Sequence, residues 1–574
     1  MENSEIADVF ERIANLLEIK GEAVYRVRAY RRASESIRAQ PQSMSSISDS
    51  GDLSEIPGVG KAIAEKIGEL LEKGNLEFYE RLTADVPETL LDVLDVQDIG
   101  PKKAALFWKE LQIETVSDLE EAAKAGRLKE LPGIGEKSEK RIIANIEAQK
   151  QRLSDRFQIG EALPIAESLL QRIYELPGVE EAQLAGSLRR WRETIGDLDI
   201  VVGTNEASGV LETFSELPEV ERVLGLGDVK ASVELKGGLR AQLWVHPPDK
   251  FGSALQYATG SQDHNVHLRE IASSNGLSLS EHGFKRDDGS EFLCADEVSL
   301  YQTLGMEWVP PELREDQGEI QAALERRLPE LVNEEALTGE LHSHSDWSDG
   351  HVTIEEMASA SLDMGLNYLV ISDHSRSLGI ANGLSIDRLN EQRKEINRVQ
   401  RKLGDSIRLL HGSEVEILAD GRLDYPDSVL AELDIVIASV HSSLRQPREQ
   451  ITQRFLNAIQ NPHVDLIAHP SGRLIGRRDP ADIDIEQILA AAAENGVILE
   501  INSHPDRLDL NDLHSKRALE LGCKLAITTD AHRPEHLQLR RYGIGVARRA
   551  WASSESIVNS WPKEHIIDWL NSRG

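Results

Sequence analysis

The sequence contains little cysteine, no long apolar run and no surplus of basic residues. Its 2 cysteines, Cys294 and Cys523, lie far apart, so they supply no disulfide framework and fit a reducing compartment. No apolar run approaches the roughly 18 residues of a membrane span, and no basic-then-apolar signal region opens the chain. We therefore expect a cytoplasmic protein that does not associate with a membrane.

The charge balance is strongly acidic, with 98 Asp and Glu against 64 Lys and Arg and a formal net charge of -34. Taken alone, this charge disfavours a nucleic-acid partner. Each basic cluster, considered alone, is explained equally well as part of a solvated surface on an acidic, salt-adapted protein and as part of a nucleic-acid binding site. The clusters are Arg26, Arg28, Arg31 and Arg32; Arg189, Arg190 and Arg192; and Arg473, Arg477 and Arg478.

At 574 residues the chain is long enough for two to four domains. Apolar residues at three- and four-residue spacing predict helices over about residues 1–150. Strand-like patterns begin after residue 158, at 197–202 and at 231–245, the latter folded at Gly237-Gly238. A Glu-rich stretch at 312–338 resembles a linker with one helix. The apolar runs that then alternate with helical patterns predict a parallel β/α architecture.

A short glycine pattern recurs in the helical region. It reads Pro57-Gly58-Val59-Gly60-Lys61, then Pro132-Gly133-Ile134-Gly135, with a degenerate middle copy at Ile99-Gly100-Pro101-Lys102. Such glycines allow a tight hairpin whose backbone N–H groups, at a helix N-terminus, can meet a phosphate. A lone copy, and the middle one in particular, is more often a simple turn between helices. Two full copies together favour DNA, held without reading its sequence.

A second motif joins a glycine-serine turn to an acidic strand. Gly186-Ser187-Leu188-Arg189-Arg190 is followed by Gly196-Asp197-Leu198-Asp199. Asp197 and Asp199 project from the same strand face and can share magnesium with a nucleoside triphosphate. Ser187 and Arg190 suit phosphate oxygens. A surface acidic strand is the alternative, but the presence of both halves at this spacing favours a nucleotidyltransferase.

Histidines gather in the C-terminal part, where 13 of the 17 follow residue 340. Apolar runs end in His374, Glu414, His441, His469 and the pair Asp530 and His532, while His342 and His344 face one side of an extended segment. Strand ends of a β/α barrel meet at one rim. One histidine at a strand end is more often structural, but several with the same placement favour a site. Imidazole and carboxylate without cysteine indicate Mn, Zn or Fe, ions suited to attack on phosphodiesters.

These residues resemble the PHP (polymerase and histidinol phosphatase) superfamily, which implies a distorted (β/α)7 barrel that binds up to three metal ions. Its ligand positions carry over to His342, His344, Asp349, His374, Glu414, His441, His469, Asp530 and His532. By the same analogy Arg473 would lie near the phosphate as a catalytic residue.

Residues 1 to about 315 resemble DNA polymerase family X, relatives of DNA polymerase beta, and the whole chain resembles the bacterial members that end in a PHP domain. The resemblance implies a multidomain fold with a helical helix-hairpin-helix region, an α+β nucleotidyltransferase palm and thumb, and the barrel. The expected domains are an N-terminal DNA-binding domain (1–80), fingers (81–155), palm (156–250), thumb (251–314), linker (315–338) and PHP domain (339–574).

The resemblance also assigns site residues. Catalytic magnesium ligands would be Asp197 and Asp199, and the nucleotide would contact Gly186, Ser187, Arg190, Tyr257, Gly260, Asn265 and Arg269. DNA would contact Gly58, Gly60, Lys61, Lys66, Gly100, Lys102, Gly133, Gly135 and Lys137, with Lys66 matching a lyase lysine. We expect a monomeric protein of the base excision repair pathway. It would bind DNA at gapped duplexes or 3′ ends, and it would also bind deoxynucleoside triphosphates.

One position departs from this family, whose palms use a third aspartate where this chain has Gln242. A two-residue turn at Gly237-Gly238 would pair Gln242 with Val233 and point Glu234 to the opposite face, so no nearby carboxylate substitutes. Glutamine cannot accept a proton, and losing a general base typically costs about 10²–10⁴-fold. We predict weak or absent polymerisation with DNA and nucleotide binding retained.

Four functions remain open at this point. The first is a repair enzyme that trims 3′ ends with its PHP site while the polymerase half clamps DNA. The second is an active gap-filling polymerase with an attached exonuclease. The third is a DNA-end-binding scaffold without catalysis, which the full ligand set disfavours. The fourth, a phosphatase of small metabolites, leaves the glycine hairpins unexplained.

Overall fold

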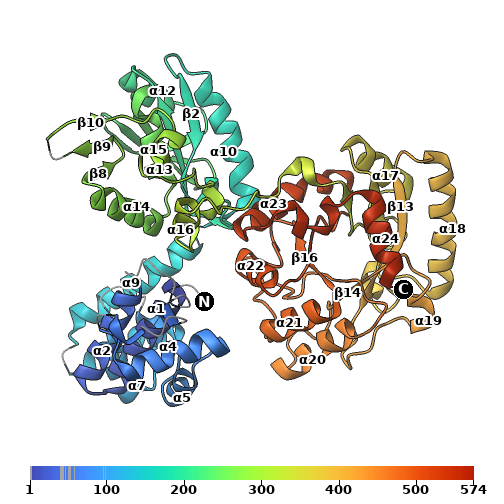
Figure 1. The fold of residues 1–574 in the computed structure, drawn as a ribbon, viewed down its shortest axis with the longest axis horizontal. Coiled ribbons are helices and arrows are strands. Elements are labelled where there is room, and N and C mark those ends of the chain that lie inside the picture. The colour runs from blue at the N-terminus through green and yellow to red at the C-terminus, as the bar shows by residue number, and fades with distance from the viewer. Residues whose placement is uncertain are drawn as a thin grey trace. The chain divides into compact units, whose positions relative to one another are not determined.

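The computed structural model describes residues 3–38, 44, 47–48, 53–56, 58–94, 96, 99–132, 134–154, 156–286 and 288–573. The chain forms two compact units, Met1–Arg156 and Phe157–Gly574 (Figure 1). None of the helices in these described ranges has the length and apolar content needed to cross a membrane.

The first unit is helical, as its apolar spacing predicts. Ile6, Phe10 and Ile13 on α1 are fully buried in its single core. Tyr30 stacks between Phe10 and Phe78, with ring centroids 5.7 and 5.8 Å away. The helices are α1 (Asn3–Lys20), α2 (Val24–Arg38), α4 (Lys61–Lys73), α5 (Glu77–Asp85), α6 (Leu90–Leu94), α7 (Pro101–Leu111), α8 (Val116–Lys124) and α9 (Glu136–Ser154).

The second unit opens with a five-stranded sheet in the order β2-β4-β7-β6-β5. Its strands are β2 (Glu181–Leu184), β4 (Asp197–Gly203), β5 (Val220–Leu226), β6 (Lys230–Leu235) and β7 (Arg240–His246). β1 (Phe157–Gln158) and β3 (Thr194–Ile195) form a separate pair. The helices here are α10 (Ile159–Tyr174), α11 (Gly186–Arg189) and α12 (Ala207–Ser215), and α10 and α12 pack their apolar faces into the same core as the sheet.

The pairing of β6 with β7 differs by one residue from the expectation. Ser232, and not Val233, lies opposite Gln242. The reason is the connection, in which Gly237 and Gly238 both have positive φ (94° and 86°) and Leu235 N–H donates to the carbonyl of Leu239. The loop therefore contains Lys236 as well as both glycines, so the two-residue turn is wrong.

The region expected to be the thumb follows, with α13 (Phe251–Thr259), α14 (Gln262–Ser274), α15 (Glu297–Thr303) and the three-stranded sheet β8 (Leu277–Ser280), β9 (Gly283–Arg286) and β10 (Glu291–Phe292). Residues 315–338, expected as a polar linker, are folded onto it through α16 (Glu319–Leu324). Glu319 is fully buried and accepts from His264 Nδ1 at 2.6 Å. The one helix expected in this Glu-rich stretch is therefore present, and the buried charge of Glu319 has an internal partner.

Seven parallel strands form the C-terminal barrel, in sequence order around the sheet. They are β11 (Gly339–Glu340), β12 (Tyr368–Ile371), β13 (Arg408–Glu416), β14 (Ile435–Ser439), β15 (Leu466–Ile467), β16 (Ile498–Asn502) and β17 (Leu525–Thr528). A bridge between Ser343 and Ala531 joins the first and last strands just beyond their ends. The predicted (β/α)7 barrel is confirmed.

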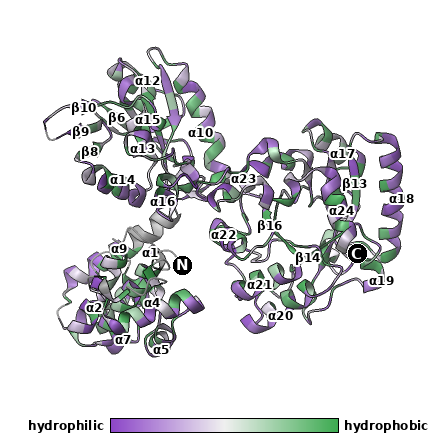
Figure 2. Cartoon of the chain, in the orientation of Figure 1, coloured by the Kyte–Doolittle hydropathy of each residue, from purple (hydrophilic) through white to green (hydrophobic). Residues whose placement is uncertain are grey.

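Helices surround this barrel: α17 (Ile354–Asp363), α18 (Ile386–Leu403), α19 (Asp427–Leu430), α20 (Arg448–Ile459), α21 (Ile485–Asn495), α22 (Asp512–Glu520), α23 (Arg540–Arg549) and α24 (Lys563–Arg573). α18 is mostly hydrophilic and buries only one stripe, which includes Ile396 and Val399 (Figure 2). The strands β12, β14 and β16 are buried throughout, as expected when helices cover a parallel sheet.

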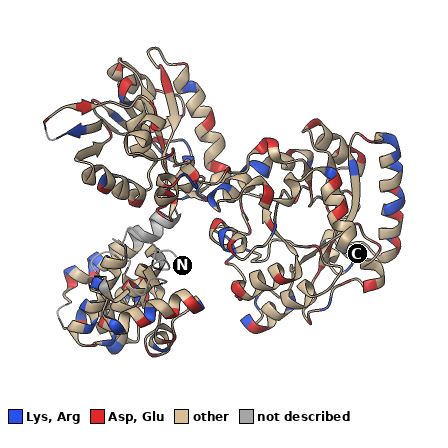
Figure 3. Cartoon of the chain, in the orientation of Figure 1, with Lys and Arg blue, Asp and Glu red and all other residues tan. Residues whose placement is uncertain are grey.

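Basic and acidic residues occur together on the helices of both units (Figure 3). Arg31 on α2 pairs with Glu18 at 2.6 Å, and Arg26 pairs with Glu22 at 2.9 Å. On α18, Arg398 pairs with Glu395 at 2.6 Å. These partly exposed ion pairs are worth little to stability, and they show why clusters of arginine alone do not identify a binding face.

Candidate metal centre and palm site

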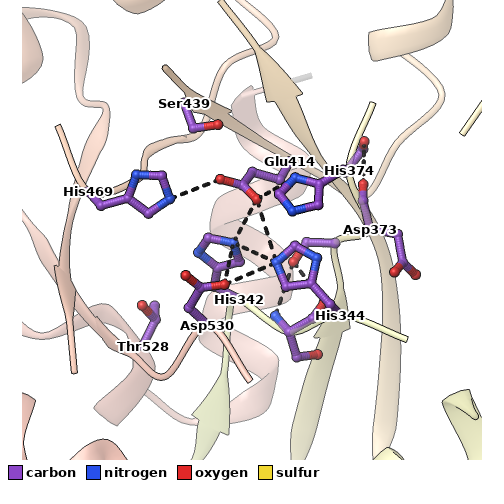
Figure 4. A network of polar contacts seen from close by, with 12 residues as sticks. His342, His344, Asp373, His374, Glu414, Ser439, His469, Thr528 and Asp530 are labelled. Carbon is purple, nitrogen blue, oxygen red and sulfur yellow. Dashed lines mark hydrogen bonds and ion pairs between the residues drawn. The ribbon is translucent and has the colours of Figure 1, made fainter. Parts of the chain in front are cut away.

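The nine predicted metal ligands lie at the carboxyl ends of the barrel strands or in the loops that follow them. Glu414 is within β13, and the others follow β11, β12, β14, β15 and β17. Figure 4 shows Glu414 with His342, His344, His374, His469 and Asp530 around it. We call these nine residues the rim cluster: His342, His344, Asp349, His374, Glu414, His441, His469, Asp530 and His532.

Donor atoms of eight of these residues, all except His469, form three overlapping groups, each within 4.8 Å. Neighbouring groups share His344 or His374, and each contains a carboxylate. Neighbouring groups of this kind would suit adjacent divalent cations. The groups are His344, Asp349, His374 and His532; His342, His344 and Asp530; and His374, Glu414 and His441.

Glu414 lies at the centre. Its Oε1 is 3.0 Å from His469 Nε2, and its Oε2 is 2.9 Å from His374 Nδ1. Although close, Oε2 has no hydrogen bond of proper geometry, and the buried Nδ1 atoms of His344 and His469 also lack one. Buried polar atoms without partners are costly. Imidazole and carboxylate donors in this state fit a divalent transition metal ion.

Protonation of the rim-cluster histidines and cation binding by the same residues are coupled. Burial would lower the pKa of His374, but Glu414 and Asp349 outweigh it and raise that pKa to about 10. Burial, followed by the neighbouring His532 and His374, lowers the pKa of His344 to about 3. Histidine ligates metal only through a deprotonated nitrogen, so cation binding competes with the proton on His374.

Two of the predicted ligands have unusual backbone conformations. His469 has φ of 28° and Asp530 has φ of 51°, both in the left-handed region. Such residues cost of the order of 1–3 kcal/mol each and persist where their surroundings hold them. The backbone N–H of His469 donates to Glu500 Oε2 at 2.6 Å, which is one such restraint.

Sequence reasoning missed a set of buried carboxylates just below the rim cluster: Glu340, Asp373, Glu416 and Glu500. Glu340 accepts from the backbone N–H of His342 at 3.0 Å, and burial raises its pKa to about 7. Glu416 accepts from His441 Nδ1 at 3.0 Å. The sequence signal that could have identified such carboxylates is a charged residue inside an apolar strand, because a buried charge needs partners.

Arg473 does not have the phosphate-facing environment expected of it. Its guanidinium donates to Glu193 Oε2 at 2.7 Å and to the carbonyls of Arg507 and Leu508 at 2.8 and 2.7 Å. Within the described residues, no hydrogen bond joins Arg473 to the rim cluster. Glu193 precedes β3, so this contact joins the palm to the barrel inside the second unit.

In the palm, the two predicted catalytic aspartates lie on β4 beside Gln242 of the parallel strand β7. Gln242 Nε2 donates to Asp197 Oδ2 at 2.5 Å. Burial, followed by the charge of Asp197, raises the pKa of Asp199 to about 6. The one-residue shift places Glu234 on the same face of the sheet as Gln242, so the expectation that it points to the opposite face is wrong. Glu234 nevertheless lies opposite Arg240 and pairs with Arg222 at 2.7 Å, so its charge already has a partner.

The glycine-serine turn is fitted against this acidic pair. Gly186 has φ of 60°, and a Cβ there would meet Asp199 Oδ2 at 2.3 Å, so only glycine fits. Ser187 is half-buried in the same turn. Arg190, predicted to bind a phosphate, instead donates to Glu315 at 3.1 Å and to the carbonyl of Thr259. A nucleotide phosphate would share or displace the Glu315 contact.

The remaining predicted nucleotide contacts lie on α13 and α14. Asn265 donates to the carbonyl of Tyr257 at 2.8 Å, and Tyr257 is 39% exposed. Arg269 is exposed one helical turn after Asn265, on the same face. A Cβ on Gly260 would lie 3.1 Å from Arg190 Nη1, so this glycine lets Arg190 approach.

The glycine hairpins of the first unit share one geometry. Gly60 and Gly100 are the N-caps of α4 and α7, and neither helix has a side-chain cap. Gly135 accepts from Ser138 and so opens α9 in the same way. Gly58 has φ of 86° in the first hairpin, and Gly133 lies outside the described residues. Lys61, Lys102 and Lys137 are exposed beside these N-termini.

Lys66 lies on α4 but is less open. Its ammonium group is 5.1 Å from the centroid of the Phe78 ring. It also donates to the carbonyl of Ala62 at 3.4 Å. A lyase role would require this amine to leave both contacts.

Family models match four parts of the chain. A helix-hairpin-helix domain matches residues 1–76 and a SAM-like helix-hairpin-helix tandem matches 90–148. The tandem includes the middle glycine copy, so its interpretation as a simple turn is wrong. The DNA polymerase beta thumb matches 254–315, and the PHP domain matches 340–504.

Among curated relatives, the DNA polymerase/3′-5′ exonuclease PolX of Bacillus subtilis is 38% identical over 564 residues, 98% of each chain. A probable phosphatase of Thermoanaerobacter sp. (strain X514) is 32% identical over 232 residues, 38% of this chain and 89% of the relative. A probable phosphatase of Shewanella sediminis is 28% identical over 245 residues, 41% of this chain and 93% of the relative. The chain therefore belongs to the PolX family, the bacterial family X DNA polymerases with a C-terminal PHP domain.

Proposed function

We propose that the rim cluster is a metal-dependent 3′–5′ exonuclease centre that trims DNA ends during base excision repair. The observation that carries this proposal is the cluster itself, in which nine imidazole and carboxylate residues converge with Glu414 at their centre and leave buried donor atoms without partners. Helix-hairpin-helix elements in the same chain make DNA the substrate. The expected partners are gapped duplexes or 3′ ends, bound by a cytoplasmic monomer.

The three donor groups would hold up to three ions, Mn or Zn with Fe as a further option. When bound, such ions activate water and neutralise charge on the attacking and leaving oxygens of a phosphodiester. The chain itself orients the donors. Glu416 accepts from His441 Nδ1, and the bonds that Glu340 and Glu500 accept fix the backbone at His342 and His469.

The palm would serve chiefly to clamp DNA and bind deoxynucleoside triphosphates. Asp197 and Asp199 can hold magnesium with the nucleotide. Gln242, however, donates a hydrogen bond to Asp197 and cannot take the proton of a primer hydroxyl. Loss of that function typically costs about 10²–10⁴-fold in rate. The relative named as a polymerase and exonuclease supports the competing possibility of active gap filling.

A second candidate is hydrolysis of small phosphate monoesters. The probable phosphatases of Thermoanaerobacter and Shewanella align with this chain over only 38% and 41% of its length, close to the size of the barrel. Their names favour this chemistry at the rim cluster, whereas the helix-hairpin-helix region has no use in it.

The deciding experiment uses a gapped duplex with a labelled primer in Mn²⁺, with and without deoxynucleotides, beside a small phosphate monoester. Shortening of the primer under both conditions supports the exonuclease. Extension at ordinary family rates contradicts the weak palm, and monoester cleavage far faster than shortening favours the second candidate. A protein that binds the duplex but does neither is a scaffold, which overturns the proposal.

A further inference from the structure

We propose that Glu500 is a positioning residue of the rim cluster, which fixes the ring of His342 and the backbone of His469 for cation binding. This inference rests on the proposed metal-binding function. Glu500 lies on β16 and is fully buried, although it is not one of the nine ligands that the family resemblance assigns.

The carboxylate of Glu500 accepts four hydrogen bonds from neighbouring segments of the barrel. Oε1 accepts from His342 Nδ1 at 2.6 Å and from Thr528 Oγ1 at 2.5 Å. Oε2 accepts from the backbone N–H of His469 at 2.6 Å and from Asn502 Nδ2 at 3.4 Å. The bonds reach the segments that follow β11 and β15 and the end of β17, so one side chain ties three strand ends together.

The bond to His342 determines which ring nitrogen is free. A neutral imidazole that donates from Nδ1 has its lone pair on Nε2. His342 Nε2 faces Glu414 Oε2 at 3.4 Å and Asp530 Oδ1 at 3.7 Å, in the centre of the rim cluster. Carboxylates that receive the second N–H of a ligating histidine fix both its tautomer and its orientation.

The bond to His469 acts on the backbone. His469 has a left-handed φ of 28°, and its N–H is a fixed donor inside the barrel. Glu500 satisfies that donor, and the ring then lies with Nε2 3.0 Å from Glu414 Oε1. A single carboxylate therefore sets two ligands that both converge on Glu414.

Glutamine at position 500 would preserve shape but not this pattern of acceptors. If its carbonyl faced the N–H of His469, its NH₂ would face His342 Nδ1, and the ring would have to carry its proton on Nε2. If its carbonyl faced His342, the NH₂ would oppose the fixed N–H of His469. Either arrangement removes one ligand from its metal-binding geometry, because a glutamine amide cannot accept at both ends.

The chain offers a matched control. Glu319 in the thumb is also fully buried and accepts from a histidine ring, His264 Nδ1 at 2.6 Å, and from the backbone N–H groups of Asp316 and Gln317 at 2.9 and 2.7 Å. E319Q therefore repeats the chemical change of E500Q away from the rim cluster. It reports how much of any effect comes from general destabilisation.

The experiment measures Zn²⁺ and Mn²⁺ affinity of the full-length protein by competition with a chromophoric chelator, and thermal unfolding in EDTA. We expect E500Q to bind metal about 10–100-fold more weakly than wild type. E319Q should lower the unfolding temperature without changing metal affinity. Glu500→Asp retains acceptor-only chemistry, so it should bind metal more tightly than E500Q, and it keeps the test usable if E500Q does not fold.

The outcomes separate this inference from the function on which it rests. A wild type that binds neither metal overturns the proposed metal centre itself. A wild type that binds metal while E500Q binds equally well overturns only the role of Glu500. Equal loss of affinity in E319Q and E500Q, or weaker binding by Glu500→Asp than by E500Q, also contradicts positioning.

Discussion

Replacing Gln242 by aspartate would restore the third palm carboxylate that family X enzymes use. In the wild type, the Gln242 amide lies 2.5 Å from Asp197 Oδ2, and β7 runs parallel to β4 with position 242 opposite Asp199. An aspartate at 242 therefore places a new carboxylate beside both existing ones without a change of register. With magnesium, the three can hold a second ion near the primer hydroxyl.

The expected gain in primer extension is about 10²–10⁴-fold, the usual contribution of a general base. A cost accompanies it. Two carboxylates about 4 Å apart repel by about 4 kcal/mol at the effective dielectric constant of a protein surface. Since burial and Asp197 already raise the pKa of Asp199 to about 6, the variant should be less stable than wild type in EDTA and recover in magnesium.

The assay follows extension of a labelled primer on a gapped duplex in a His344→Ala background, so that trimming at the rim cluster does not remove the product. Gln242→Asn, which is neutral, is the control and should remain as slow as glutamine. Equal extension rates in wild type and Gln242→Asp, or an acceleration in Gln242→Asn as large as that in Gln242→Asp, would show that the missing third carboxylate does not limit polymerisation.

Three further predictions concern stability and binding. Glu297→Gln removes the partner of the fully buried Arg314, 2.6 Å away, so urea unfolding should show a loss of about 3–5 kcal/mol, against little change in exposed Glu291→Gln. Burial would raise the pKa of Glu297, but Arg314 and Arg189 hold it well below its usual range. The stabilisation that ionised Glu297 provides is therefore present above pH ~4.3 and lost as the pH falls. In Glu297→Gln, the free energy of unfolding should depend less on pH over this acidic range. A Cβ at Gly60 meets nothing within 4 Å, so Gly60→Ala should unfold like wild type yet bind DNA about tenfold more weakly if a phosphate approaches this N-terminus. Removing metal with a chelator should lower stability by about 2.7 kcal/mol per ion lost, if the metal had been present at 100 times its dissociation constant.

The barrel and the position of the rim cluster followed from sequence because strand ends in a parallel barrel share one edge. An apolar run that stops at His374 or His441 is a local signal, and topology then brings such residues together. Asp349 was assigned only by the resemblance, because it lies in a loop and does not directly follow an apolar strand pattern.

Other features depended on contacts between distant segments. Glu500 lies inside an apolar strand, and only the folded barrel shows that its carboxylate accepts hydrogen bonds from His342 and His469. The pairing of Gln242 shifted by one residue because the turn includes Lys236, which a glycine pair alone does not reveal. Arg473 was expected near a phosphate, whereas its guanidinium donates a hydrogen bond to Glu193, which lies 280 residues earlier in the chain.

The central claim is that the rim cluster, and not the palm, is the stronger catalytic centre of this chain. The most direct measurement compares wild type, His344→Ala and Asp197→Asn on one labelled 3′ end in Mn²⁺ without nucleotides. We predict that His344→Ala shortens the strand at least about 100-fold more slowly, while Asp197→Asn shortens it as wild type does. Equal shortening by His344→Ala and wild type, or loss of shortening in Asp197→Asn, would show that the rim cluster is not the stronger catalytic centre.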